Sequence, residues 1–367
     1  MNMGTLQAAR GRRRVPGISE DVTISRRRLM LLAGAAGLLG PSASVFGQTQ
    51  APAAAAGQAR FFRIGTGALG GVYYPVGGAI ALAISNPPGS RPCDKGGSCG
   101  VPGLVAVAQS SHGSLSNVQA IGAGTLDSGF VQADVAYWAF TGTGIFEGKP
   151  RMDQLRAIAN LYPEHVHLVV RKSAGVKGIR DLRNRTVSLD EQGSGTLVSA
   201  RAILQAFGVR ETDLKARYIT ASQSIKAVKE GALDAFFFFS GYPAPAVAEL
   251  AEAGEIDLLP VSGPPIERLL QRFGFFAMDL IPSGAYYGVK RTDTISVGAQ
   301  WLVSAKAPDD LVHDITATLW SKATRPVLEK SHPRAQQIKL ETALTGLAVP
   351  LHPGAERFYR ANGVLRD

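Results

Sequence analysis

The chain has 367 residues and a formal net charge of +10, with 19% charged and 45% hydrophobic residues. This length and composition predict a globular protein of two ordinary domains. The basic residues form no block with interleaved aromatic residues, which argues against a nucleic-acid partner. The six histidines and two cysteines show neither zinc-ligand spacing nor a His-Glu-x-x-His motif. We therefore expect no metal and no cofactor.

The first 47 residues are typical of a twin-arginine (Tat) export signal. Arginines at 26–27 precede an uncharged apolar run over 29–40, which is shorter than the roughly 20 residues that cross a membrane. We expect cleavage after Gly47 and an Ala/Pro/Gln-rich linker over 48–60. The signal holds +5 of the net charge of +10, so the mature chain is mildly cationic. The leader predicts a periplasmic protein, and a cytoplasmic protein with a basic start is the alternative.

A glycine-rich loop follows the first strand predicted in the mature chain. Residues 61–64 favour a strand, the loop runs from Gly65 to Gly71, and helical spacing begins near Pro75. A helix N-terminus behind a glycine turn offers unpaired N–H groups to an anion. The loop also reads Gly-x-Gly-x-x-Gly, a dinucleotide fingerprint, but no acidic residue follows where the ribose needs one. A solute site and a nucleotide site both stay open.

Cys93 and Cys99 lie in a Pro/Gly-rich segment after this helix. In an exported protein, two cysteines without a neighbouring histidine or third cysteine favour a disulfide over a metal or redox site. The closed loop is short, so the bridge should stiffen the chain only locally.

The next two strands are expected to carry polar residues toward one edge of a sheet. The helix after the first of them opens at Ser114 and contains Asn117, and both residues suit either capping or ligand contact. Residues 130–137 alternate in part, as a strand that places Gln132 and Asp134 on one face.

The arrangement of a strand, a glycine turn and a helix start then recurs in the middle of the chain. Residues 155–160 and 165–170 predict two strands joined by a short connection, and 186–190 predict another. Ser194 and Thr196 lie in the glycine turn that follows, where their hydroxyls can cap a helix and donate to a carboxylate. Glycines flank Ser194 directly, so the turn is not the Gly-x-Ser-x-Gly nucleophile elbow.

Four consecutive aromatic residues at 236–239 predict a strand buried on both faces. Phe239 and Tyr242 fall at its carboxyl end, where ligands meet parallel sheets. Beyond Ile281 we expect a returning strand pair, followed by helices from Asp309 onward. Strands that alternate with helices throughout indicate the α/β class.

Together these segments resemble the TAXI family, the solute receptors of TRAP transporters. The resemblance covers residues 61–363 and implies a two-lobed periplasmic-binding-protein fold, type II-like, with the ligand cleft between the lobes. Lobe 1 would span 61–166 with 281–367 returning, and lobe 2 would span 167–280. The motifs are Gly65-Thr-Gly with Gly70-Gly-Val-Tyr73-Tyr74-Pro75, Ser114-Leu-Ser-Asn117, Gln132-x-Asp134, Gly193-Ser-Gly-Thr196, and Asp234-Ala-Phe-Phe with Gly241-Tyr242-Pro243.

The patterns and the resemblance predict a non-enzymatic receptor without catalytic residues. Its ligand would be a small carboxylate or amino acid such as glutamate or glutamine, and its partners the TRAP membrane permease subunits. We expect a monomer. The alternatives are a Rossmann-type oxidoreductase and a ligand-sensing receptor for a membrane kinase. The predicted ligand contacts are Thr66, Gly67, Gly71, Tyr73, Tyr74, Ser114, Asn117, Gln132, Asp134, Ser194, Gly195, Thr196, Phe239 and Tyr242.

Overall fold

A computed structural model describes residues 58–366, and within them ten strands form one mixed sheet. The predicted export signal and residues 48–57 of the predicted linker lie outside the described residues. Two short strands, β2 and β3, pair separately beside the cysteine loop. The strands are β1 (Arg60–Gly65), β2 (Ser85–Asn86), β3 (Val101–Pro102), β4 (Leu104–Gln109), β5 (Ser128–Gln132), β6 (Leu155–Arg171), β7 (Thr186–Ser188), β8 (Lys215–Arg217), β9 (Ala235–Ser240), β10 (Ile256–Leu259), β11 (Phe276–Ile281) and β12 (Thr292–Ser304).

Helices alternate with these strands, and several end at a glycine in the left-handed region. Gly124 and Gly142, for example, follow α2 and α3 with φ of 73° and 70°, a conformation that glycine adopts without steric cost. The helices are α1 (Tyr73–Ile84), α2 (Ser114–Ala123), α3 (Ala133–Thr141), α4 (Gly195–Ala206), α5 (Ala221–Lys229), α6 (Pro245–Glu252), α7 (Pro264–Arg272), α8 (Asp309–Leu319), α9 (Arg325–Ser331) and α10 (Pro353–Ala361).

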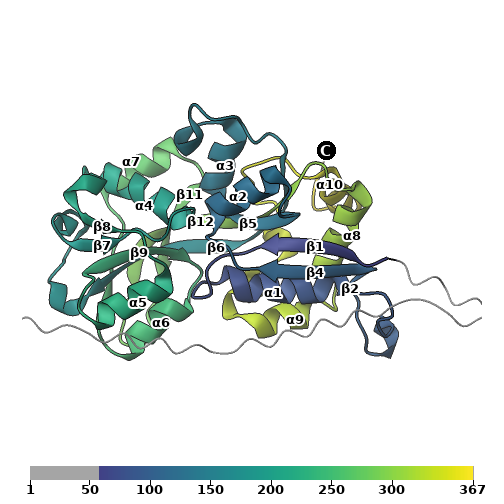
Figure 1. Ribbon diagram of the computed structural model, residues 1–367, viewed down its shortest axis with the longest axis horizontal. Coiled ribbons are helices and arrows are strands. Elements are labelled where there is room, and N and C mark those ends of the chain that lie inside the picture. The colour runs from purple at the N-terminus through teal and green to yellow at the C-terminus, as the bar shows by residue number, and fades with distance from the viewer. Residues whose placement is uncertain (1–57, 367) are drawn as a thin grey trace, which may run out of the picture. The chain divides into compact units, whose positions relative to one another are not determined.

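The strand order divides the sheet into two halves. It runs β4-β1-β5-β12-β6-β9-β7-β8, with β10 and β11 paired to β6 and β12. The outer strands on each side pair in parallel, whereas the central β12 and β6 run antiparallel to each other and to their outer neighbours. Figure 1 shows β6 and β12 in the middle, with β1 and β4 on one side and β7, β8 and β9 on the other. This is the two-lobed α/β arrangement that the sequence predicts.

Helices cover both faces of each half (Figure 1). In the half that contains β1, the helices α1, α8 and α10 bury one face around Phe62 and Trp301, and α2 and α3 bury the other around Val131. In the other half, α4 and α7 pack on one face of β9, and α5 and α6 pack on the opposite face. Since β9 is covered on both sides, its four phenylalanines are all buried, as predicted.

Two predicted elements are wrong. The strand predicted over 130–137 ends at Gln132, and helix α3 begins at the next residue, because its apolar positions bury one helical face. The two strands predicted over 155–170 are one strand, β6, of 17 residues. Pro163 is tolerated inside it because β9 pairs with β6 only from His165 onward, so one edge of β6 has no ladder at Pro163. β6 thus runs through the predicted boundary between the lobes without a break.

Two further observations concern the described residues as a whole. Cys93 and Cys99 are bonded, with their Cα atoms 4.7 Å apart, which confirms the predicted disulfide. Between residues 58 and 366, no helix combines the length and apolar character needed to cross a bilayer.

Candidate ligand-binding site

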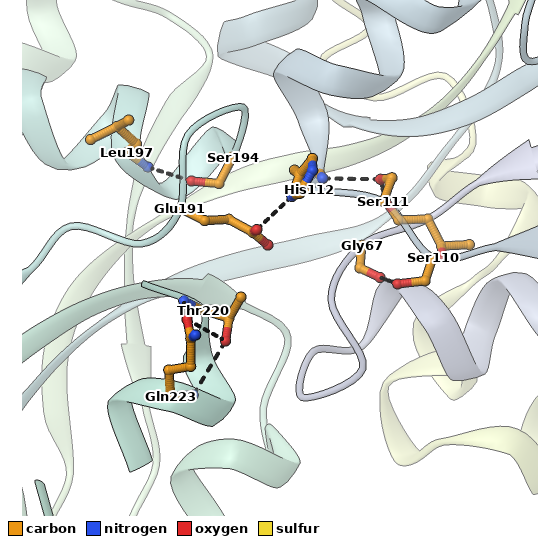
Figure 2. A network of polar contacts seen from close by, with 11 residues as sticks. Gly67, Ser110, Ser111, His112, Glu191, Ser194, Leu197, Thr220 and Gln223 are labelled. Carbon is orange, nitrogen blue, oxygen red and sulfur yellow. Dashed lines mark hydrogen bonds and ion pairs between the residues drawn. The ribbon is translucent and has the colours of Figure 1, made fainter. Parts of the chain in front are cut away.

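A small cavity lies where the loops of the two halves meet at the carboxyl ends of β1, β4, β7 and β9. Its volume is about 50 Å³, which is room for about four water molecules. Figure 2 shows the loops that approach one another here, with His112 from one half pointing toward Glu191 of the other.

The first wall is the glycine loop between β1 and α1. Gly67 and Gly71 line the cavity through their backbone. Ser110, from the loop after β4, donates to the carbonyl of Gly67 at 3.1 Å (Figure 2), and Ser111 donates to the carbonyl of Thr66 at 3.0 Å. These bonds fix the loop against its neighbour and leave the start of α1 facing the cavity.

The second wall is the start of α2. Ser114 lies at its first position, and its hydroxyl accepts a hydrogen bond from the backbone N–H of Gln132 at 3.0 Å. The side chain of Gln132 lines the cavity, and its Oε1 is buried without a hydrogen-bond partner in the described chain. A buried amide oxygen of this kind is an acceptor available to a ligand.

The third wall is the start of α4, in the other half. Ser194 caps this helix by accepting from the N–H of Leu197 at 3.0 Å (Figure 2), and Thr196 Oγ1 accepts from the N–H of Phe239 at 3.1 Å. The two halves touch at Gly195, where an added Cβ would lie 1.6 Å from Gln132 Oε1. A glycine is therefore required at this position for the halves to approach so closely.

Direct contacts close the cavity on several sides. His112 and Glu191 pair across it, and the N–H of Ser116 donates to the carbonyl of Gly193 at 3.0 Å. Behind these contacts, Ser199 Oγ on α4 donates a hydrogen bond to Asp134 Oδ2 on α3 at 2.6 Å. The two halves thus hold one another at the rim of the cavity.

Three carboxyl groups line the cavity, and the lining contains neither lysine nor arginine. Burial raises the pKa of Glu164 to about 8. The hydrogen bond that Tyr73 Oη donates to its Oε2 at 2.6 Å lowers this pKa but does not outweigh burial. Burial likewise raises the pKa of Asp190 to about 7, although nearby hydroxyl and N–H donors lower it. Asp190 has φ of 71°, a left-handed conformation that Asp and Asn adopt more readily than other residues with side chains. The third group, Glu191, is paired to His112.

Nine of the fourteen predicted contact residues line this cavity, and five do not. Thr66 bonds to the carbonyl of Gln109, and Asn117 donates to the carbonyls of Thr66 and Phe130. These side chains support the glycine loop from behind. Tyr74 points to solvent, Asp134 is held by Ser199, and Tyr242 packs against Arg334. The nine are Gly67, Gly71, Tyr73, Ser114, Gln132, Ser194, Gly195, Thr196 and Phe239.

The prediction from sequence missed the three carboxyl groups and the histidine in the lining. Asp190 had a usable signal, because it ends a strand directly before a glycine turn. Glu164 had none, since it lies inside what was read as a connection and is brought to the cavity by the crossing strand β6. The missed lining residues with side chains of functional interest are His112, Glu164, Asp190, Glu191, Phe238 and Ser240.

Residues 64–363 match the NMT1-like family. Among solved structures, the chain is similar to the alkanesulfonate-binding protein SsuA from Xanthomonas axonopodis pv. citri bound to MOPS, with 15% identity, a TM-score of 0.44, and coverage of 83% of this chain and 84% of that one. PhnD1 from Prochlorococcus marinus MIT 9301 in complex with methylphosphonate shows 11% identity and a TM-score of 0.48, with 83% and 99% covered. An ancestral arginine-binding protein bound to arginine shows 15% identity and a TM-score of 0.43, with 74% and 97% covered.

Proposed function

The chain belongs to the NMT1-like family, and we propose that it is an extracytoplasmic solute receptor whose two halves close on a small α-amino acid. The twin-arginine leader supports export, and the cavity between the halves supports capture. In this proposal the protein binds and releases its ligand unchanged and is not an enzyme.

The observation that carries the proposal is the mixture of groups around the cavity. Helices α1, α2 and α4 begin there, at Tyr73, Ser114 and Gly195, and the first N–H groups of a helix have no partner within it and favour a negative charge. Asp190, whose pKa of about 7 leaves it partly ionised at neutral pH, faces the same space and favours a positive charge, and Glu164 can release its proton to accept an ammonium group. A zwitterion satisfies both sets, with its carboxylate at the helix starts and its ammonium group at the acidic side chains.

A ligand that carries only negative charge fits this lining less well. The carboxylates of the lining that are ionised would repel it, and the lining has no arginine or lysine to compensate. Ionised groups of like sign in a site with little water are strongly unfavourable. We therefore place an α-amino acid, with glutamate and glutamine as the first candidates, ahead of dicarboxylates and 2-oxo acids.

The same lining opposes the dinucleotide alternative for the Gly-x-Gly-x-x-Gly loop. A cavity of about 50 Å³ is much smaller than the roughly 300–1,000 Å³ of pockets that hold drug-sized ligands, and a pyrophosphate would meet Glu164 and Asp190 beside the start of α1. The fingerprint glycines serve instead to bring the backbone close to the cavity.

The motifs shared with the TAXI family support delivery of the ligand to TRAP membrane permease subunits. In that arrangement the permease recognises the closed form, in which His112 and Glu191 meet across the cleft. Reconstitution with the permease would test this part: uptake that needs an ion gradient and not ATP is expected, and ATP-dependent uptake would contradict it.

Isothermal titration calorimetry with matched ligands tests the ligand class. Glutamate and 2-oxoglutarate share a carbon chain and two carboxylates and differ in the ammonium group. We expect glutamate or glutamine to bind and 2-oxoglutarate, succinate and nicotinamide dinucleotides to bind at least about 100-fold more weakly, since an unpaired buried carboxyl costs about 3 kcal/mol. Equal binding of glutamate and 2-oxoglutarate would overturn the zwitterion proposal.

A further inference from the structure

Arg334 is a buried arginine behind the cavity. It lies on a short 3-10 helix, η6 (Pro333–Gln337), and is 2% exposed. Its guanidinium carbon lies 3.8 Å from the ring centre of Tyr242, and its Nη1 donates to Gln337 Oε1 at 2.6 Å. Its Nε and Nη2 are buried and have no hydrogen-bond partner among residues 58–366. Two of the three nitrogens therefore keep unused donors.

The charge of Arg334 also lacks an ionic partner. No carboxylate lies within salt-bridge distance of it in the described chain. Glu164 is close enough for the guanidinium to lower its pKa, but burial dominates and keeps that pKa at about 8. Glu164 therefore does not neutralise the arginine at neutral pH. A buried charge without a counter-charge is costly, and proteins pair such groups.

A second unused donor lies near the first. Tyr162, on β6, is 1% exposed, and its hydroxyl has no partner in the described residues. Tyr162 and Gln337, the residue bonded to Arg334, line one groove, and the positive charge of Arg334 lowers the pKa of Tyr162 against the effect of burial. The other ionisable groups that feel this charge are His165, His167, Tyr286 and His332.

An open groove lies beside this place. The groove has a volume of about 530 Å³, and its lining includes Tyr162, Gln337 and Lys339. Gln337 is the residue that holds Arg334, and Lys339 adds a second positive charge at the exposed surface.

We infer that Arg334 and the hydroxyl of Tyr162 bind a small anionic group between the two halves of the molecule. Guanidinium groups bind such groups through two parallel N–H donors. The group is either a free anion of the size of chloride or the carboxylate of a ligand held in the cavity. Both sources have the same chemistry at the arginine, and the experiment below separates them.

The location gives the bound anion a structural consequence. Tyr242 and Pro243 follow β9 in one half, and η6 approaches them from the C-terminal part of the chain, where His332 Nε2 meets the carbonyl of Pro243 at 3.0 Å. An anion that satisfies Arg334 would hold its side chain over Tyr242. Anion binding should therefore stabilise the contact between η6 and the loop after β9.

Crystals grown in bromide give a direct test, because bromide replaces chloride and is located by its anomalous scattering. We expect a peak at hydrogen-bond distance from Arg334 Nε or Nη2. A peak that is the same with and without glutamate identifies a free anion. A peak that glutamate replaces with a carboxylate oxygen identifies the cavity ligand as the source.

Thermal unfolding provides a second test of the inference. At matched ionic strength, chloride at ten times its dissociation constant should raise the Tm of the wild-type protein over gluconate by about 3 °C. Arg334→Met should lose this difference, Tyr162→Phe should reduce it, and the surface control Arg291→Met should keep it. Absence of bromide and of a ligand carboxylate at Arg334, with the same Tm in both salts for the wild type, would overturn the inference.

Discussion

Lowering the pH from 7.0 to 5.5 should weaken amino-acid binding about 15-fold if the ammonium group requires an ionised Asp190. With a pKa of about 7, about half of this side chain is ionised at pH 7.0 and about 3% at pH 5.5. The apparent affinity scales with the binding-competent fraction, which gives the factor. Raising the pH to 8.0 should strengthen binding about twofold.

Replacing the side chain separates this effect from a general effect of acid. Asp190→Asn keeps the left-handed backbone accessible, since Asn adopts it as readily as Asp, and removes the charge. A hydrogen bond to a charged group contributes about 1.5–3 kcal/mol, so the variant should bind about 10- to 100-fold more weakly at pH 7.0. Its affinity should also vary less with pH. Asp257→Asn, on the exposed side of β10, is the matched control and should behave as the wild type does.

The unliganded protein should respond to pH in the opposite direction. The pKa of Asp190 is higher in the folded chain than its ordinary value of 3.8, so the folded state binds more protons than the unfolded state. The free energy of unfolding therefore falls as pH rises from about 4 to 7. Asp190→Asn should reduce this loss, and a ligand ammonium group should offset it.

Calorimetric titrations at three pH values, together with thermal unfolding of the free protein, measure both effects. An affinity that is equal at pH 5.5 and 7.0, or an Asp190→Asn variant with wild-type affinity and pH profile, would refute the assignment of the ammonium group to Asp190. If the Asp190→Asn variant keeps the wild-type affinity and still binds more weakly toward pH 5.5, Glu164, whose pKa is about 8, is the group to test next.

Three other changes probe the cavity and its surroundings. Gly195→Ala should abolish ligand binding in calorimetry while the free protein still folds, because its Cβ would lie 1.6 Å from Gln132 Oε1 when the halves meet; wild-type affinity would contradict this. His112→Ala should weaken binding only about two- to fivefold, since exposed ion pairs contribute about 0–1 kcal/mol. Stopped-flow measurement should show this change in the dissociation rate. Replacing Cys93 and Cys99 by serine should lower the free energy of unfolding by at most about 2 kcal/mol and leave ligand affinity unchanged.

Local sequence patterns are sufficient to predict the strands and helix starts that surround the cavity. The glycine turns before α1 and α4 each follow an apolar strand and precede a helix. The turn before α4 also carries a capping hydroxyl, and Ser194 caps that helix as these rules expect. The run of aromatic residues in β9 likewise predicts burial on both faces, because polar and apolar residues do not alternate along it.

The crossing strand could not be predicted in the same way. Pro163 usually interrupts a strand, and the chain around Glu164 therefore looks like a connection. Its acceptance depends on β9, which lies much later in the chain and pairs with β6 only from His165 onward. Glu164 and Arg334 become important for the same reason, since only the folded chain brings them close to one cavity.

The predicted position of Asp134 illustrates a different limit. Residues 130–137 contain both alternation and helical spacing, and the helix forms because Val135, Ala136 and Ala139 fill a buried face against neighbouring elements. Asp134 then points to Ser199 and away from the cavity. Tertiary packing decided between two patterns of similar local strength.

A crystal structure of the protein with glutamate, or with the tightest ligand from calorimetry, tests the central claim most directly. We expect the ammonium nitrogen within hydrogen-bond distance of Asp190 or Glu164 and the α-carboxylate at the N-terminus of α2 or α4, enclosed by both halves. A ligand bound outside this cavity, or one whose carboxylate rather than its ammonium group faces Asp190 and Glu164, would contradict the account.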